Sequence, residues 1–236
     1  MSLKSFQEAL AEIITSPQIG NTYHKDPALL DQKYTLTEKE RGRLLGMIQQ
    51  KGMRINYMLY QMNRLTPLTM LMPYSLKILH PQLMSVLHQF WAAYPKTSFQ
   101  FVDELSFFSS FLKEKIAEGV LDLPYLEDVI CVEDAINDIR FSTRENSDAN
   151  DEFYTLHPSA RVVYMEHEAD LLVKTMVTYD SSLPLPAVPK AEGYYVLHYN
   201  GRLTTYPLDT AAALSLLDKQ PVEDVPDELV EMGLLI

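Results

Sequence analysis

The stretch YYVLHYNGRLTTYPL, residues 194–208, decides the fold class, because it carries the clearest strand signal in a chain otherwise patterned as helix. Its apolar and aromatic residues surround Asn200-Gly201. This dipeptide tolerates the positive φ angles that a type I′ turn requires, and it is the strongest short-range signal for a hairpin. We therefore predict a β-hairpin over residues 194–206.

Short helices together with this hairpin predict an α+β unit of about winged-helix size in the last third of the chain. A further strand is predicted at residues 160–167 and a short helix at residues 169–177. The polar segment STRENSDANDE, residues 142–152, has no apolar period and is predicted to be an exposed linker. The expected domains are a mostly helical one, 1–141, and a small α+β one, 153–236.

Helical signals dominate the first domain. Thr37-Glu38-Lys39-Glu40 has the form of a capping box, and a long helix is predicted to follow to about Asn63, with Gly52 as a possible break. The stretch FVDELSFFSSFLKEK, residues 101–115, repeats apolar side chains at helical spacing. Residues 21–36 are predicted to form a loop.

Four prolines are expected to bound short helices in this domain, because proline blocks continuation of a helix at its own position. Helices are predicted at residues 81–93 and 123–139. The prolines are Pro67, Pro73, Pro81 and Pro95.

Composition and charge limit the classes of function. The formal net charge of -12 disfavours nucleic acid as a partner, because binding to phosphates depends on Lys and Arg. The single cysteine, Cys131, excludes an internal disulfide and fits a reducing compartment. Glu8 and Glu12 interrupt the first apolar stretch, which disqualifies it as a secretory signal. No apolar run is long enough to span a membrane, so we expect a cytoplasmic protein.

Catalytic motifs are absent from the sequence. The glycines form no phosphate-binding loop, and neither GxSxG nor HExxH occurs. Glu166, His167 and Asp170, with Glu168, are the best metal candidates, but alternate residues of a strand point to opposite faces. We therefore expect no catalytic residue, no metal site and no cofactor in this chain, and we interpret Cys131 as a packing residue.

One region concentrates positive charge. Its cations fit a partner protein or a polyanion equally well, and a solvated helix face is the simplest interpretation. The candidate contact residues are Arg41, Arg43, Lys51, Arg54 and Arg64, with Lys39 beside them.

The predicted hairpin offers a different kind of site. A small sheet has open edges, and an open edge can accept an extended peptide as an additional strand. Tyr194, Val196, His198 and Tyr206 are the residues expected to flank such a peptide. A short or covered edge is the alternative.

A succession of aromatic and proline positions carries a family resemblance. The marks are Arg54, Tyr57, Met72-Pro73, Phe90, the run Tyr94-Pro95-Lys96-Thr97-Ser98, Phe107, Phe111, Leu112, the run Pro124-Tyr125-Leu126-Glu127-Asp128, and Glu133. Over about residues 37–140 the chain resembles a bacterial family named for a DNA-binding domain in its N-terminal half. HPSARVV and YYVLHYNGRLTTYPLD also match that family's layout. Within the family the chain is most similar to the partner subunits of methanobactin biosynthesis.

The resemblance implies an accessory subunit rather than an enzyme. In such systems a multinuclear iron oxidase modifies a cysteine of a ribosomal precursor peptide. The accessory subunit pairs with that oxidase as a heterodimer and helps to bind the leader of the peptide, partly by strand addition. Iron is then expected in the partner. The alternative is a DNA-binding transcriptional regulator that uses the C-terminal unit or the cationic region.

Overall fold

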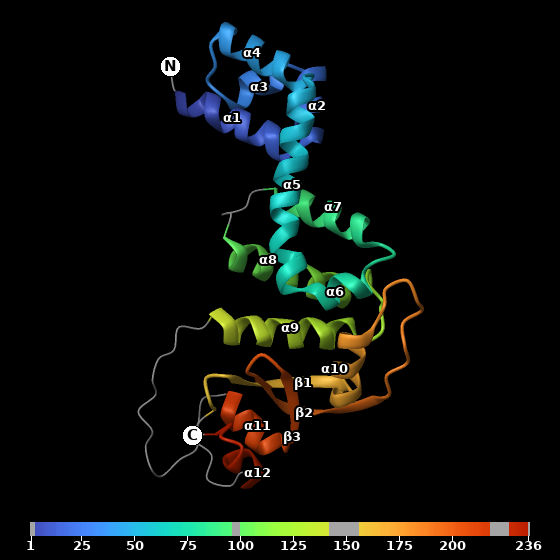
Figure 1. Cartoon of the computed structure of the whole chain (residues 1–236). Helices are drawn as coiled ribbons and strands as arrows, with labels where there is room; N and C mark the ends of the chain where they lie inside the picture. The colour runs from blue at the N-terminus through green and yellow to red at the C-terminus, as the bar shows by residue number, and fades with distance from the viewer. Residues whose placement is uncertain (1–2, 96–99, 142–155, 218–226, 236) are drawn as a thin grey trace. The chain divides into compact units, whose positions relative to one another are not determined.

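The computed structural model describes residues 3–95, 100–141, 156–217 and 227–235, and it confirms the predicted α+β class (Figure 1). The described residues contain one sheet, which has three antiparallel strands. The chain divides into two compact units, one comprising residues 1–70 and 84–107 and the other comprising residues 71–83 and 108–236.

All regular secondary structure in the described residues of the first unit is helical. It takes in α5 up to Met70, α7 from Met84 onward and the first turns of α8. Its elements are α1 (Leu3–Thr15), α2 (Pro17–Lys25), α3 (Ala28–Lys33), α4 (Glu38–Ile48), α5 (Lys51–Leu71), α7 (Leu83–Ala93) and α8 (Phe101–Ala117).

Helices α1 to α4 share one apolar core, built on the fully buried Ala9, Leu30 and Leu44. The predicted loop at residues 21–36 is wrong, because α2 runs to Lys25 and α3 lies within it. Side chains from these short helices converge on Glu12. Tyr23 and Tyr34 donate hydrogen bonds of 2.7 and 2.6 Å to its carboxylate. These contacts are distant in sequence, so local propensity does not reveal them.

The predicted capping box is confirmed, since the Thr37 side chain and Glu40 bond reciprocally at the start of α4. The long helix breaks between Ile48 and Lys51, just before Gly52. The next helix, α5, runs past the predicted end at about Asn63 and passes through Pro67, which was expected to bound a short helix. Both Pro67 and Leu68 are buried, so packing of this turn outweighs the hydrogen bond that proline removes.

The described residues of the second unit contain the sheet and five complete helices, together with the rest of α8. Its elements are α6 (Pro73–Ile78), α9 (Leu126–Phe141), β1 (Ala160–His167), α10 (Ala169–Thr178), β2 (Lys190–Tyr199), β3 (Leu203–Leu208), α11 (Thr210–Leu217) and α12 (Asp227–Glu231). The linker predicted at residues 142–152 lies outside the described residues, and α9, on its N-terminal side, packs against β1.

The sheet has the strand order β1-β2-β3, with α9 on one side and α11 and α12 on the other (Figure 1). The hairpin is confirmed, but its turn is not of type I′. Tyr199 pairs with Leu203, so the loop has three residues. Among the described residues of this loop only Gly201 has a positive φ, of 98°. A single glycine therefore provides the left-handed residue that a three-residue loop requires.

A buried carboxylate joins α6 to α9. Glu133 accepts hydrogen bonds from the backbone N–H groups of Tyr74 and Ser75, at 2.7 and 3.0 Å, and from the Ser75 hydroxyl at 2.5 Å. Burial raises the pKa of Glu133 to about 7, although these hydrogen bonds act in the opposite direction. Asn137 adds a 2.7 Å bond from Nδ2 to the carbonyl of Leu71. Together they fix α9 as the helix that faces the sheet.

Candidate functional site

A groove of about 460 Å³ is lined by α9 and β1 in the second unit. Four successive residues of β1, 161–164, line it. Because side chains of a strand alternate between the two faces of a sheet, successive residues can share a groove only along the edge of the strand. The lining residues are Lys113, Glu127, Asp128, Cys131, Asp134, Ala135, Asp138, Arg161, Val162, Val163, Tyr164 and Glu166. The groove thus follows the outer edge of the sheet.

The pairing of β1 with β2 determines which backbone groups face this groove. The N–H of Tyr199 donates to the carbonyl of Ser159 at 3.0 Å, and Val162 lies opposite Val196. In an antiparallel pair, hydrogen-bonded residues alternate with residues whose backbone groups point away from the partner. The N–H and C=O groups of Val162 and Tyr164 therefore point away from β2, toward the groove.

Side chains satisfy the backbone at both ends of this edge. At one end Asp128 accepts hydrogen bonds from the N–H groups of Glu166 and His167, at 3.1 and 3.0 Å, and from the His167 ring at 2.8 Å. At the other end the Arg161 guanidinium donates to the carbonyl of Ala160 at 2.7 Å. The open edge is consequently short and is centred on residues 162–164.

The helical wall of the groove carries charged side chains. Asp134 receives hydrogen bonds of 2.7 and 2.6 Å from Lys113 and Ser109, and Asp138 forms an ion pair with Arg161. Glu127 is exposed at the surface of the same helix. Carboxylates outnumber cations along the lining, so the groove favours a ligand with basic or hydrogen-bond-donating side chains.

The opposite edge of the sheet, on β3, differs in composition. Pro207 lies opposite Tyr195. The backbone groups of Tyr195 pair with β1 and not with β3, so the backbone of Pro207 faces outward. Proline has no N–H to offer to an added strand, and it is a known means of blunting an edge. The β1 edge combines outward-facing N–H groups with a groove.

The structure corrects the placement of the predicted peptide contacts. Tyr194, Val196 and His198 lie on β2, the central strand, which pairs with β1 on one side and with β3 on the other and therefore has no open edge. Val196 is fully buried, and Tyr194 and Tyr206 pack on the core formed by α11 and α12. Which strand lies at the edge depends on the strand order of the sheet, and a hairpin signal in the sequence does not reveal that order.

The residues of the predicted cationic contact region do not form one exposed surface. Arg64 is wrong as a contact residue, because it is only 2% exposed and its Nε donates to Glu104 at 2.7 Å. Arg41 is paired with Asp31 at 2.7 Å. The remaining three, Arg43, Lys51 and Arg54, are exposed.

Glu127-Asp128 and Glu133-Asp134 are two adjacent pairs of carboxylates on α9, and one member of each pair is buried. Asp128 is 4% exposed and Glu133 is 2% exposed. Their partners lie about forty to sixty positions away in the chain, so no local spacing signals them. Asp128, Val162 and Tyr164 are therefore the groove residues that the sequence did not indicate.

The candidate metal ligands named from the sequence form other contacts. His167 binds Asp128, Glu168 caps α10 by accepting from the N–H of Leu171 at 2.8 Å, and Asp170 accepts from Thr205. Among the described residues no three His, Cys, Asp or Glu side chains are arranged to hold a metal ion. Burial raises the pKa of the Cys131 thiol, which is the opposite of the shift that activates a nucleophilic cysteine.

Comparison with protein-family models finds no match, and no curated protein matches the sequence. The family resemblance therefore stays a prediction. Within the described part of the chain, no helix combines the length and the apolar content needed to cross a lipid bilayer.

Proposed function

We propose that this chain is a non-catalytic recognition subunit of a peptide-modifying complex, in which it pairs with a multinuclear iron oxidase and holds the precursor peptide. The observation that carries the proposal is the groove along the outer edge of β1. The iron-containing partner is what the family resemblance implies, and the peptide is the ligand that an open strand edge recognises.

The bound peptide adds as a fourth strand beside β1. Val162 and Tyr164 together offer up to four backbone hydrogen bonds, two N–H and two C=O, which give affinity without regard to sequence. Side chains of the peptide that point toward α9 meet Glu127 and the paired Asp134. Basic or hydroxyl-bearing side chains are favoured at these positions, and acidic ones are disfavoured.

Co-expression with the adjacent open reading frames tests the proposal, followed by size-exclusion chromatography and metal analysis of each fraction. We expect this chain to co-elute with an iron-containing neighbour and with the encoded peptide. A chain that elutes alone and binds duplex DNA with a steep salt dependence would overturn the proposal in favour of the regulator.

A proline substitution separates the groove from the partner contact. Val162→Pro removes one outward N–H without breaking the pairing to β2, so the variant should lose the peptide and keep the oxidase. The matched control is Leu203→Pro, at the first position of the other edge strand. Equal retention of the peptide by both variants contradicts strand addition at β1.

A further inference from the structure

Helix α5 in the first unit is apolar on two opposite faces. One face is buried and includes Tyr60 and Leu68. The other carries large apolar side chains that are between 49% and 60% exposed, at the i, i+3, i+4 and i+7 positions of one helical stripe. We call this the α5 stripe; it consists of Ile55, Met58, Leu59 and Met62.

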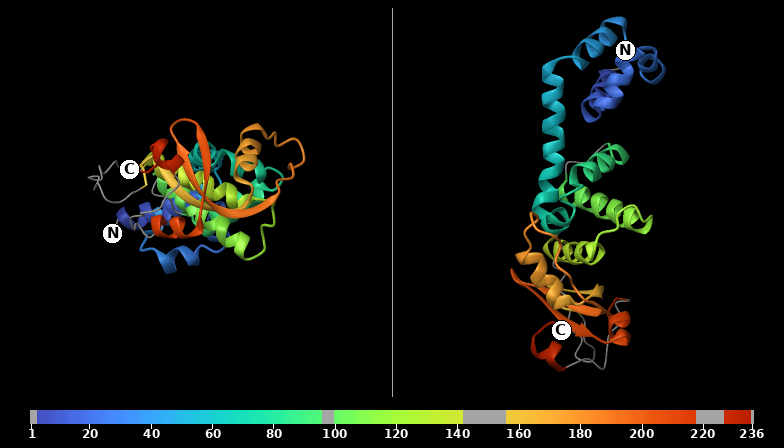
Figure 2. Two further views of the ribbon diagram at one scale, coloured as in Figure 1. Left: turned by 90° about the horizontal axis from the view of Figure 1, so that it is seen from below. Right: turned by 90° about the vertical axis from the view of Figure 1, so that its right-hand side faces the viewer.

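Other helices of the unit leave this face of α5 uncovered. In the right-hand view of Figure 2, helices α1 to α4 and α7 lie on one side of α5 and its other side is bare. A single exposed leucine or methionine is ordinary, but a continuous stripe on one helix marks an interaction surface.

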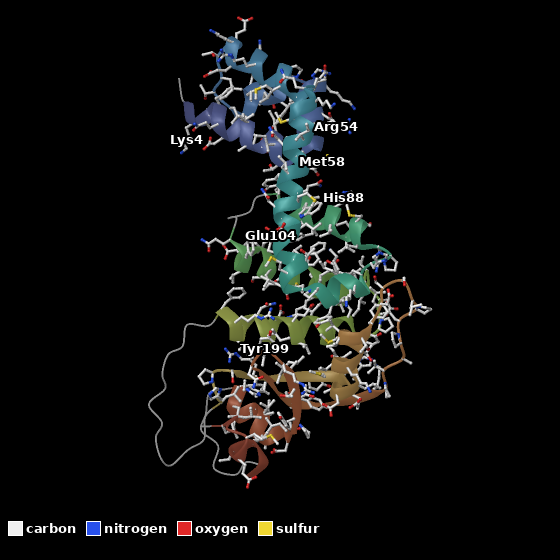
Figure 3. All side chains as sticks on the ribbon, viewed as in Figure 1. Lys4, Arg54, Met58, His88, Glu104 and Tyr199 are labelled. Carbon is white, nitrogen blue, oxygen red and sulfur yellow. The ribbon has the colours of Figure 1, made fainter. Side chains whose placement is uncertain are left out.

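A hollow of about 700 Å³ adjoins the stripe, and Met58 contributes to both. Its apolar residues include Ile13, Ile48 and Met53, and its polar residues include His24 and Arg54. Arg54 and Met58 are both labelled on α5 in Figure 3. A side chain that projects from a docked helix can enter this hollow, whereas a flat bilayer surface cannot fill it.

The charge around the stripe selects the partner. The sequence from Arg41 to Val102 contains seven Lys and Arg residues and no Asp or Glu, in a chain whose net charge is -12. Lys51 and Arg54 are exposed beside the stripe, and among the described residues neither forms an ion pair. A carboxylate-bearing surface complements them.

We propose that the α5 stripe and the adjoining hollow bind an acidic amphipathic helix of a partner protein. Its apolar side chains pack on the stripe, where unbranched methionines adapt to the shape of a helix, and its carboxylates meet Lys51 and Arg54. A second copy of α5 would instead place the same cations together without a carboxylate. This proposal uses none of the residues of the β1 groove and stands apart from the proposed function.

Two fluorescein-labelled synthetic helices test the charge selection by anisotropy with the full chain. One carries leucines on one face and glutamates on the other, and its twin carries lysine in place of every glutamate. We expect the glutamate peptide to bind and the lysine peptide to bind at least about ten-fold more weakly. Equal binding of the two, or none by the glutamate peptide, overturns the proposal.

Matched substitutions locate the site. Met58→Glu should weaken binding of the glutamate peptide by about ten-fold or more, because it removes a methionine that the bound helix would cover and adds a like charge. Val177→Glu on α10 is the control, since Val177 and Met58 are both 60% exposed. It should leave binding unchanged, and thermal melts verify that both variants are folded. Equal losses in the two variants contradict binding at the stripe.

Two further outcomes would assign the surface to another occupant and overturn the proposal. One is a dimer of the chain alone, seen by analytical ultracentrifugation, that Met58→Glu dissociates. The other is binding to phosphatidylserine vesicles that the same variant abolishes, while the glutamate peptide does not compete.

Discussion

Among the described residues each unit buries one glutamate, and the two units accommodate that charge in different ways. Glu104 of the first unit and Glu133 of the second are both 2% exposed. Glu104 accepts from the Nε of Arg64 at 2.7 Å, and the same guanidinium lies 5.0 Å from the centre of the Phe90 ring. Glu133 has only uncharged donors, from Tyr74 and Ser75.

The difference shows two costs of a buried carboxylate. An ion pair leaves polar atoms that geometry cannot always satisfy, and among the described residues neither Nη2 of Arg64 nor Oε2 of Glu104 has a hydrogen-bond partner. Hydrogen bonds from neutral donors satisfy Glu133 more completely but leave its charge uncompensated, so burial raises the pKa of this carboxyl group. The stability of the first arrangement depends on the partner side chain, and the stability of the second depends on pH.

Arg64→Ala is expected to have the largest effect on stability. It leaves the Glu104 carboxylate buried without its cation, and breaking a buried pair in this way costs about 3–5 kcal/mol. Urea denaturation measures the loss. Arg54→Ala, on the exposed side of the same helix, should change stability by less than about 0.5 kcal/mol.

A double variant sharpens this prediction. Arg64→Met with Glu104→Leu removes both charges, and it should recover most of the stability that Arg64→Ala loses. A double variant as unstable as the single one would show that the cation contributes through its packing on Phe90 rather than by pairing with Glu104.

The pH dependence of Glu133 is the second prediction. Its pKa in the folded chain is about 7, above the ordinary value of 4.5, so the folded state binds more protons between these two values. Stability from this group is present below pH 4.5 and falls by about 3 kcal/mol as the pH rises to about 7.

Comparison with a variant that cannot titrate isolates this effect. The difference in unfolding free energy between the wild type and Glu133→Gln should decrease across the window from pH 4.5 to 7. Glu127→Gln, on the exposed side of the same helix, serves as control for the other carboxylates. A difference that is constant with pH would mean that Glu133 stays ionised in the folded state.

Loss of a helix cap is expected to have the smallest effect on stability. Each unit has such a cap, so the two units can be compared again. Thr37 caps α4 in the first unit, and Asp209 caps α11 in the second by accepting from the N–H groups of Ala211 and Ala212. Replacing either residue by Ala should cost about 1 kcal/mol in urea denaturation. Thr37→Ser and Asp209→Asn retain a capping oxygen and should cost less than half as much.

Signals that depend on a few adjacent residues predicted the structure well. The capping box at Thr37, the hairpin at Gly201 and the amphipathic helix that begins at Phe101 are all found. Predictions failed where distant contacts outweigh local preference. Pro67 lies inside α5 because its turn is buried, and α3 forms because Leu30 enters a core shared with α1 and α4.

The candidate site was less predictable than the fold. The sequence indicated a small sheet with edges, but three of the four residues that it assigned to an edge lie on β2, the central strand, and only Tyr206 lies on the edge strand β3. Asp128, which closes one end of the groove, meets His167 across thirty-nine positions of sequence. Such pairs arise only when α9 and β1 have packed together, so residue types and spacing alone do not indicate them.

Pro207 has a consequence for how copies of this chain can associate. A sheet with two open edges can join head to tail, the first edge of one molecule receiving the last edge of the next, and such joining extends without limit. Here the β3 edge carries a proline at an outward position, and the β1 edge is short and closed at both ends. Both edges are therefore restricted, which disfavours the joining of sheets into a fibre.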